Sequence, residues 1–222
     1  MKPILTRKQT ALRRLALLLA IFLAASALNL VNLLPRQAVE DMADQQDIEH
    51  PVVIRRFYDG TLPVTRFALQ YLVEGDDAMM LCTTGYHPLE GWYDRDWCRV
   101  ETWDGAPVHV GLRIHAQGGK RTAYLFGRID DASVTALTLR FSQHLFPEGV
   151  ESFQEVPHVL EVPREAVFRG ENGNRYLLAP ITLPSAGEKY PQFADFRILG
   201  YDREGKVLAD EEVPYQSWST SG

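Results

Sequence analysis

The alternation of apolar and polar positions is clearest between residues 123 and 141, where it predicts two β-strands joined by a turn. In Val134–Phe141 every second residue falls on one face of a strand, and that face carries Thr135, Leu137, Leu139 and Phe141. When apolar residues recur at every second position, they all lie on one face of the strand, and that face points towards a core. Ala123–Ile129 is apolar on both parities, which is typical of a central strand covered on both sides. Asp130 and Asp131 between the two segments favour a turn, so the remaining segments are expected to pack around this pair.

Other short segments with the same period, or with short apolar runs, predict further strands. They are residues 64–73, 78–84, 108–115, 159–162, 166–168, 175–183, 193–201 and 206–208. Asn172-Gly173 and Asp202–Gly205 have the composition of tight turns, and Pro180 indicates an edge or bulged strand. We therefore expect a mainly β protein, folded as a single antiparallel β-sandwich of the immunoglobulin-like kind or as an open barrel.

The N-terminal pattern is different, because Leu15–Leu34 contains twenty residues without a charge. A helix of that length spans about 30 Å, which is the hydrocarbon thickness of a bilayer. Five basic residues and no acidic residue precede it, and such a flank orients the N-terminus to the cytoplasm. The sequence thus predicts a single-pass anchor in the cell membrane, with the C-terminal domain outside. Ala25-Ser26-Ala27 also fits a signal-peptidase site, and cleavage after Ala27 would give a secreted protein.

This reading divides the chain into five parts. A cytoplasmic basic segment covers residues 1–14, the anchor or signal segment 15–34, a stalk 35–51, the extracytoplasmic β domain 52–214, and a flexible tail 215–222. Residues 36–222 hold 18 basic and 29 acidic residues, a net charge of −11. A domain this acidic repels phosphate backbones, so nucleic acid is not expected as a partner.

Cys82 and Cys98 are the two cysteines of the chain, and both would lie on the exported side. In an oxidising compartment such a pair predicts a disulfide, which would add roughly 3 kcal/mol of stability in the chain-entropy model. The stretch between them is rich in aromatic side chains, and we expect it to form a loop closed by that bridge.

The aromatic side chains of residues 83–103 allow two interpretations. Exposed rings, namely Tyr86, Trp92 and Tyr93 near the tip, would form a surface that binds a sugar or a protein, because flat apolar faces bind well. Alternatively the rings fold inward as a small core of their own. We expect a mixture, with Trp97 and Trp103 packed beside the bridge and the tip residues at least partly exposed.

The sequence contains no recognisable catalytic motif. His109, Arg113 and His115 share the polar face of one strand, and the two histidines would stand about 20 Å apart, too far to share a metal. A face in contact with solvent is expected there. The acidic residues near the aromatic stretch lack the register of a calcium loop. Enzymatic activity is therefore left uncertain, and no metal or cofactor is predicted.

Two segments carry a resemblance to a known kind of protein. GRIDDASVTALTLRF (127–141) and FRILGYDREGKVL (196–208) resemble small bacterial extracytoplasmic proteins with one N-terminal anchor and one immunoglobulin-like sandwich. The resemblance implies an architecture and a location. The function expected is that of a membrane-anchored, non-catalytic interaction or sensing module of the cell envelope, whose partner is an envelope protein or a glycan. The alternative is a protein that binds carbohydrate or processes an envelope polymer through the aromatic stretch.

Overall fold

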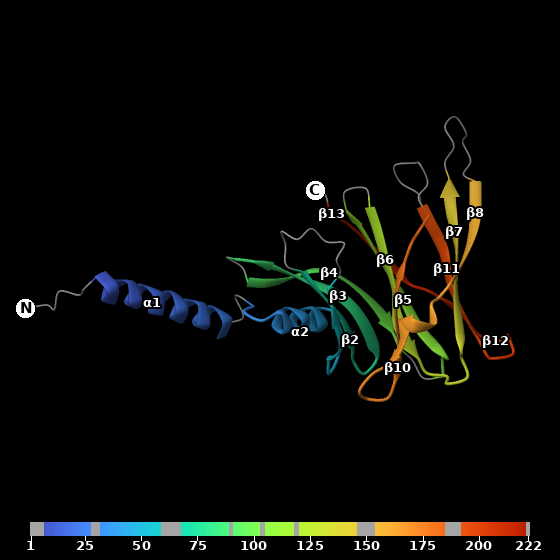
Figure 1. Ribbon diagram of the computed structural model, residues 1–222, viewed down its shortest axis with the longest axis horizontal. Helices are drawn as coiled ribbons and strands as arrows, with labels where there is room; N and C mark the ends of the chain where they lie inside the picture. The colour runs from blue at the N-terminus through green and yellow to red at the C-terminus, as the bar shows by residue number, and fades with distance from the viewer. Residues whose placement is uncertain are drawn as a thin grey trace, which may run out of the picture.

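Three stacked β-sheets form most of the protein, and a helix covers the outer face of the first sheet (Figure 1). The structure is a computed structural model. It describes residues 7–27, 32–58, 68–88, 91–102, 105–117, 120–145, 154–184 and 192–220. The expectation of a mainly β, sandwich-like protein with antiparallel sheets is confirmed, and the sheets do not close into a barrel.

Sheet A is antiparallel and has four strands in the order β1-β2-β3-β4. Its strands are β1 (Val52–Phe57), β2 (Ala68–Glu74), β3 (Ala78–His87) and β4 (Gly91–Glu101). The stretch that we expected to be a disulfide-closed loop is therefore a hairpin of two long strands. Residues 103 and 104, including Trp103, lie outside the described residues.

Sheet B is the central layer, with the order β13-β5-β6-β10-β9. Its strands are β5 (Val108–Gln117), β6 (Lys120–Ile129), β9 (Val167–Arg169), β10 (Arg175–Ile181) and β13 (Tyr215–Thr220). The C-terminal segment, which we expected to be a flexible tail, runs parallel to β5 from residue 215 to residue 220. The turn predicted at Asn172-Gly173 joins β9 to β10, with Gly173 at φ 84°.

Sheet C is the third layer and has the order β12-β11-β7-β8. Its strands are β7 (Ala136–Leu145), β8 (Gln154–Glu161), β11 (Gln192–Tyr201) and β12 (Val207–Glu212). The central strand–turn–strand was predicted in part only. Both strands exist, but β6 belongs to sheet B and β7 to sheet C, so the turn at Asp130-Asp131 carries the chain from one sheet to the next.

Two cores of different character hold the three sheets together. Between sheets B and C the core is large and apolar, with Leu112 and Leu125 facing Leu139 and Ile198. Between sheets A and B a smaller apolar cluster contains Leu81 and, from the other side of β6, Phe126. Strand β6 is thus covered on both faces, as its sequence predicted.

Helix α2 (Pro35–Gln45) lies against sheet A and makes a third core with it (Figure 1). Pro35 suits the first turn of a helix, and the side chain of Gln37 accepts a hydrogen bond from the Leu34 amide at 2.9 Å. Val39 and Met42 are buried on the face that meets the sheet. The segment that we expected to be a stalk is therefore packed on the β domain.

Helix α1 (Arg7–Ala27) lies beyond α2, at the end of the molecule opposite sheet C (Figure 1). Its large apolar side chains at positions 12, 15, 17, 18, 19, 21 and 23 are between 55% and 68% exposed. No helix within the described residues is both long enough and apolar enough to cross a membrane. The apolar run continues through residues 28–31, which the structure does not describe.

Candidate functional site

The aromatic residues predicted as a binding surface lie near the tip of the β3–β4 hairpin, but on two different faces. Tyr86 and Trp92 are directly opposite each other, with ring centroids 5.4 Å apart. Tyr93 is opposite Gly85 and therefore points to the other face of the hairpin. A Cβ atom at Gly85 would lie 2.6 Å from the Tyr93 ring, so this ring lies across the backbone of β3. The structure thus brings together Tyr86 and Trp92, and not all three residues.

Exposure also separates these residues. Tyr86 is 40% exposed, while Trp92 and Tyr93 are partly buried. Trp97, lower on the same strand, packs against the core between α2 and sheet A. The hairpin therefore has an aromatic pair at its tip, with Tyr86 exposed and Trp92 partly buried, and a packed aromatic ring near its base.

The N-terminal segment is attached to this tip. The backbone amide of Trp92 donates a hydrogen bond to the carbonyl oxygen of Asn32 at 2.8 Å. The side-chain amide of Asn32 donates to Asp41 of α2 at 2.7 Å. Asn32 was expected to lie inside the membrane-spanning run, and the structure places it in the folded domain instead.

The predicted disulfide is wrong. Cys82 is opposite Trp97 and Cys98 is opposite Leu81, so the two thiols occupy adjacent register positions. Adjacent positions point to opposite faces of a sheet. Cys82 therefore enters the core under α2, whereas Cys98 enters the core between sheets A and B. Both are free thiols, and burial raises the pKa of each to about 12.

The polar face predicted for β5 is not exposed to solvent either, because sheet A covers it. Arg113 is 2% exposed and His109 is 1% exposed. The Arg113 guanidinium donates to the carboxylate of Asp96 at 2.9 Å, and also to Thr83 at 2.7 Å and Gln70 at 2.8 Å. These three acceptors stand side by side on β4, β3 and β2. A buried charge needs such partners, and sequence spacing alone does not reveal them.

A second polar group joins sheets A and B near the end of β2. Glu74 accepts hydrogen bonds from Arg128 at 2.9 Å, from the hydroxyl of Tyr176 at 2.5 Å and from Asn172 at 3.1 Å. Burial raises the pKa of Tyr176, and the hydrogen bond to Glu74 adds to this effect. Arg128 also bonds to Asp130, and this bond raises the pKa of the guanidinium. The arrangement ties sheets A and B together.

His109 lies beside this second group. Its Nε2 atom is 3.2 Å from the carboxylate of Asp130. Burial lowers the pKa of His109, and Asp130 offsets part of that shift. Arg128 and Glu211 are the other charged residues that act on it, with opposite effects. Its imidazole is therefore neutral at neutral pH.

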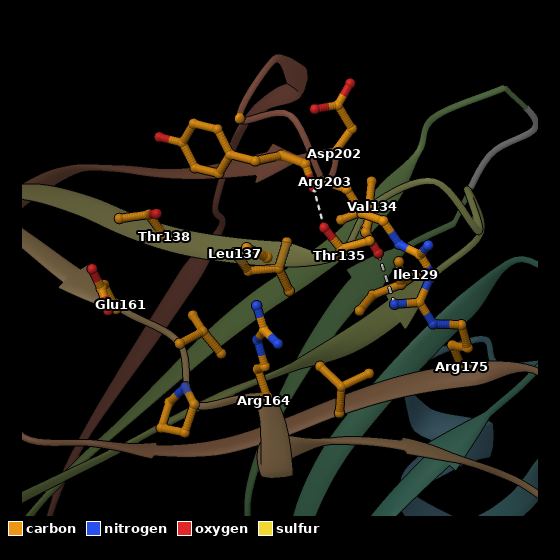
Figure 2. Close-up of a pocket in the computed structure, with 16 residues that line it drawn as sticks. Ile129, Val134, Thr135, Leu137, Thr138, Glu161, Arg164, Arg175, Asp202 and Arg203 are labelled. Carbon is orange, nitrogen blue, oxygen red and sulfur yellow. Dashed lines mark hydrogen bonds between the residues drawn. The ribbon is translucent and has the colours of Figure 1, made fainter.

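An open cleft of about 990 Å³ lies between sheets B and C, at the end where the 130–135 and 202–205 turns meet (Figure 2). Its walls combine apolar side chains, among them Ile129, Leu137 and Val162, with polar and charged ones. Arg164, from the short 3-10 helix Arg164–Ala166, projects into it towards Leu137 (Figure 2). No pattern in the sequence had indicated this cleft.

The charged residues of the cleft differ in how they are held. Arg175 donates to the carbonyl oxygens of Asp131 and Val134, which fixes its guanidinium against the 130–135 turn. The Asp202 carboxylate accepts from backbone amides of its own turn. The side chains of Arg164 and Glu161 make no hydrogen bond or ion pair with any residue that the structure describes. The cleft therefore presents one guanidinium and one carboxylate that are available for a ligand, beside the apolar side chains.

One group of residues has the composition of a metal site. Ligand atoms of Glu49, His50 and Asp76 lie within 4.8 Å of one another, and all three side chains are exposed. Nδ1 of His50 is 2.9 Å from the carboxylate of Asp76, and that hydrogen bond raises the pKa of His50. These three residues could hold a cation at the surface. No metal was expected from the sequence.

No protein-family model, curated protein or solved structure matches this chain.

Proposed function

We propose that the chain is a membrane-anchored, extracytoplasmic, non-catalytic interaction or sensing module of the cell envelope. Its anchor is the apolar N-terminal segment and its binding site is the cleft between sheets B and C. The ligand class is a carboxylate attached to an apolar group, such as the free C-terminus of an envelope protein.

The anchor is supported by the chemistry of α1. From Leu15 onward α1 carries no charge, and a helical segment that is apolar on all sides needs a protein core or a lipid around it, whereas the leucines of α1 are largely exposed. The basic residues that precede Leu15 favour retention of the N-terminus in the cytoplasm.

Arg164, an exposed side chain at the open cleft without a partner among the described residues, is the observation that carries the proposed binding function. A guanidinium binds a carboxylate through two parallel hydrogen bonds, and the apolar side chains of the cleft can contact an apolar group of the same ligand. Capture of a terminal carboxylate together with an apolar side chain is a recurring mode of peptide recognition. The cleft lies in the two sheets farthest from α1, where a tethered domain would meet a partner (Figure 1).

The anchor is tested by the mass and extraction of the full chain. We expect an intact N-terminus in membranes washed with alkaline carbonate, and digestion of the β domain by protease added outside the cell. A chain that begins at Leu28 and is released into the medium would show that it is secreted after cleavage at Ala27.

The cleft is tested with a probe peptide of leucine and valine that carries a free carboxylate, compared with the same peptide amidated. We expect the free peptide to raise the melting temperature of the wild-type chain, and the amidated peptide to raise it much less. Arg164→Glu should abolish the shift. Arg140→Glu, at an exposed arginine of β7 outside the cleft, is the matched control and should keep it. Equal shifts by both peptides, or none by either, would contradict the proposed site.

Carbohydrate binding is the second candidate, and the accessible pair Tyr86 and Trp92 favours it. Sugar rings stack on such faces. We expect this function to require Trp92 and to be independent of Arg164, so Trp92→Ala and Arg164→Glu separate the two candidates in a binding assay with envelope glycans.

A further inference from the structure

The tip of the β3–β4 hairpin lies at the residue where the apolar N-terminal run meets the folded domain. Asn32 is held there by Asp41 through its side chain and by Trp92 through its backbone. The part of the uncharged run that is free to enter a membrane therefore ends at Val31, and Leu15–Val31 is 17 residues long. As a helix this segment would measure about 26 Å, a few ångströms less than the roughly 30 Å of a bilayer core.

A span this short leaves no spacer between the lipid and the domain. Long basic side chains at its start, Arg13 and Arg14, can extend to the inner boundary. Asn32 then lies at the outer boundary of the hydrocarbon, because hydrophobic mismatch draws the ends of a short span to the interface. Trp92 and the carboxylate of Asp41, which are both hydrogen-bonded to Asn32, lie at the same depth.

The residues at that depth have the chemistry of a membrane interface. Tyr86 and Trp92 form a ring pair next to the Asn32 contact, and Tyr86 is 40% exposed. Tyrosine and tryptophan are enriched at headgroup level because each has an apolar ring and a polar handle. The net charge of −11 on residues 36–222 opposes flat adsorption of the domain to an anionic surface.

We infer that Tyr86 and Trp92 insert into the lipid headgroup region beside the anchor and fix the orientation of the domain on the membrane. This inference rests on the anchor of the proposed function. With the hairpin tip at the membrane, sheet C, the layer farthest from α1, lies away from the bilayer (Figure 1). The partner of this surface is a lipid headgroup layer, and zwitterionic lipids suffice for it.

The test measures tryptophan fluorescence of the full chain in phosphatidylcholine vesicles whose acyl chains carry bromine near the headgroup. We expect bromine to remove about one quarter of the emission, one indole of the four. Trp92→Phe should lose this quenching. Trp97→Phe is the matched control, since Trp97 packs against the core under α2, and it should keep the quenching. Tyr86→Trp, which leaves Trp92 in place, should increase the quenching by bromine. This variant tests the same contact if Trp92→Phe does not fold.

The outcomes separate this inference from the anchor. Chain that floats with the vesicles after a carbonate wash but shows the same quenching with and without Trp92 overturns the inference and leaves the anchor intact. Chain that is lost from the vesicles overturns the anchor. Protection of Trp92 from iodide by a soluble envelope glycan, with no quenching by brominated lipid, overturns the inference in favour of carbohydrate binding.

Discussion

Removal of the Arg113 side chain is the most informative perturbation of this fold, because its charge is buried between two sheets. In Arg113→Met the carboxylate of Asp96, itself 4% exposed, keeps its place without a cation. Loss of one partner of a buried ion pair typically costs about 3–5 kcal/mol, a large share of the roughly 5–15 kcal/mol by which domains are stable. We expect a loss in that range for Arg113→Met.

The pH dependence of that loss should distinguish the two partners. A buried carboxylate without a cation can take up a proton, so the deficit of Arg113→Met should shrink as the pH is lowered. Arginine does not release its proton in proteins. The deficit of Asp96→Asn should therefore stay nearly constant with pH. The double variant Arg113→Met/Asp96→Leu removes both charges and should be more stable than either single variant.

The assay is equilibrium urea unfolding of the full chain in a mild non-ionic detergent, followed by fluorescence between pH 5 and pH 8. Arg197→Met is the matched control, since Arg197 and Asp210 form an exposed pair on sheet C, and it should change stability little. If Arg113→Met costs less than about 1 kcal/mol, or if the single losses simply add in the double variant, the buried pair is not coupled as we describe.

Three further predictions follow from single sites. Cys82 and Cys98 should resist thiol reagents in the native chain, because burial raises the pKa of each to about 12. Both should react after unfolding without a reductant. A requirement for a reductant would contradict the structure, in which both cysteines are free thiols. His109 has a lowered pKa, so the unfolded chain binds more protons below pH 6.5 and stability should fall as the pH drops through that region. Urea unfolding at several pH values should show a shallower fall for His109→Gln. Gly127→Ala should destabilise the chain by about 3 kcal/mol or fail to fold, because its Cβ atom would clash with the backbone carbonyl of His109; a melting temperature near wild type would refute this.

Most of the strands could be predicted from sequence because a period of two is a local property, although β1, β4 and β13 were missed. Leu137 and Leu139 face a core, and the turn at Asn172-Gly173 depends on a glycine with positive φ. The sheet to which a strand belongs is not a local property, because it depends on which distant strands pair with it. The residues of β6 and β7 look like a hairpin, yet the two strands do not pair with each other. Strand β6 pairs with β5 and β10, whereas β7 pairs with β8 and β11.

The burial of charged residues could not be predicted for the same reason. His109 and Arg113 alternate with apolar residues as they would on a solvent-facing strand. Their acceptors come from strands up to 43 positions away, and no local pattern marks Gln70 or Thr83 as partners of a cation. The separation of the two thiols could not be predicted either, because the faces of the sheet that Cys82 and Cys98 occupy depend on the register of β3 and β4 and on the bulge near Thr83.

The chemistry of the A–B interface explains how sheet A keeps one position on sheet B. An apolar core of the kind between sheets B and C tolerates small displacements, because hydrophobic burial is not directional. Arg113 instead bonds to one residue on each of three neighbouring strands, and neighbouring strands are about 4.8 Å apart. A shift of sheet A by one strand would leave the guanidinium without its carboxylate, at the cost of an unpaired buried charge. Sheet A also carries the Asn32 contact at the tip of its hairpin, so the same side chain that fixes the register also fixes where the N-terminal segment meets the domain relative to the cleft.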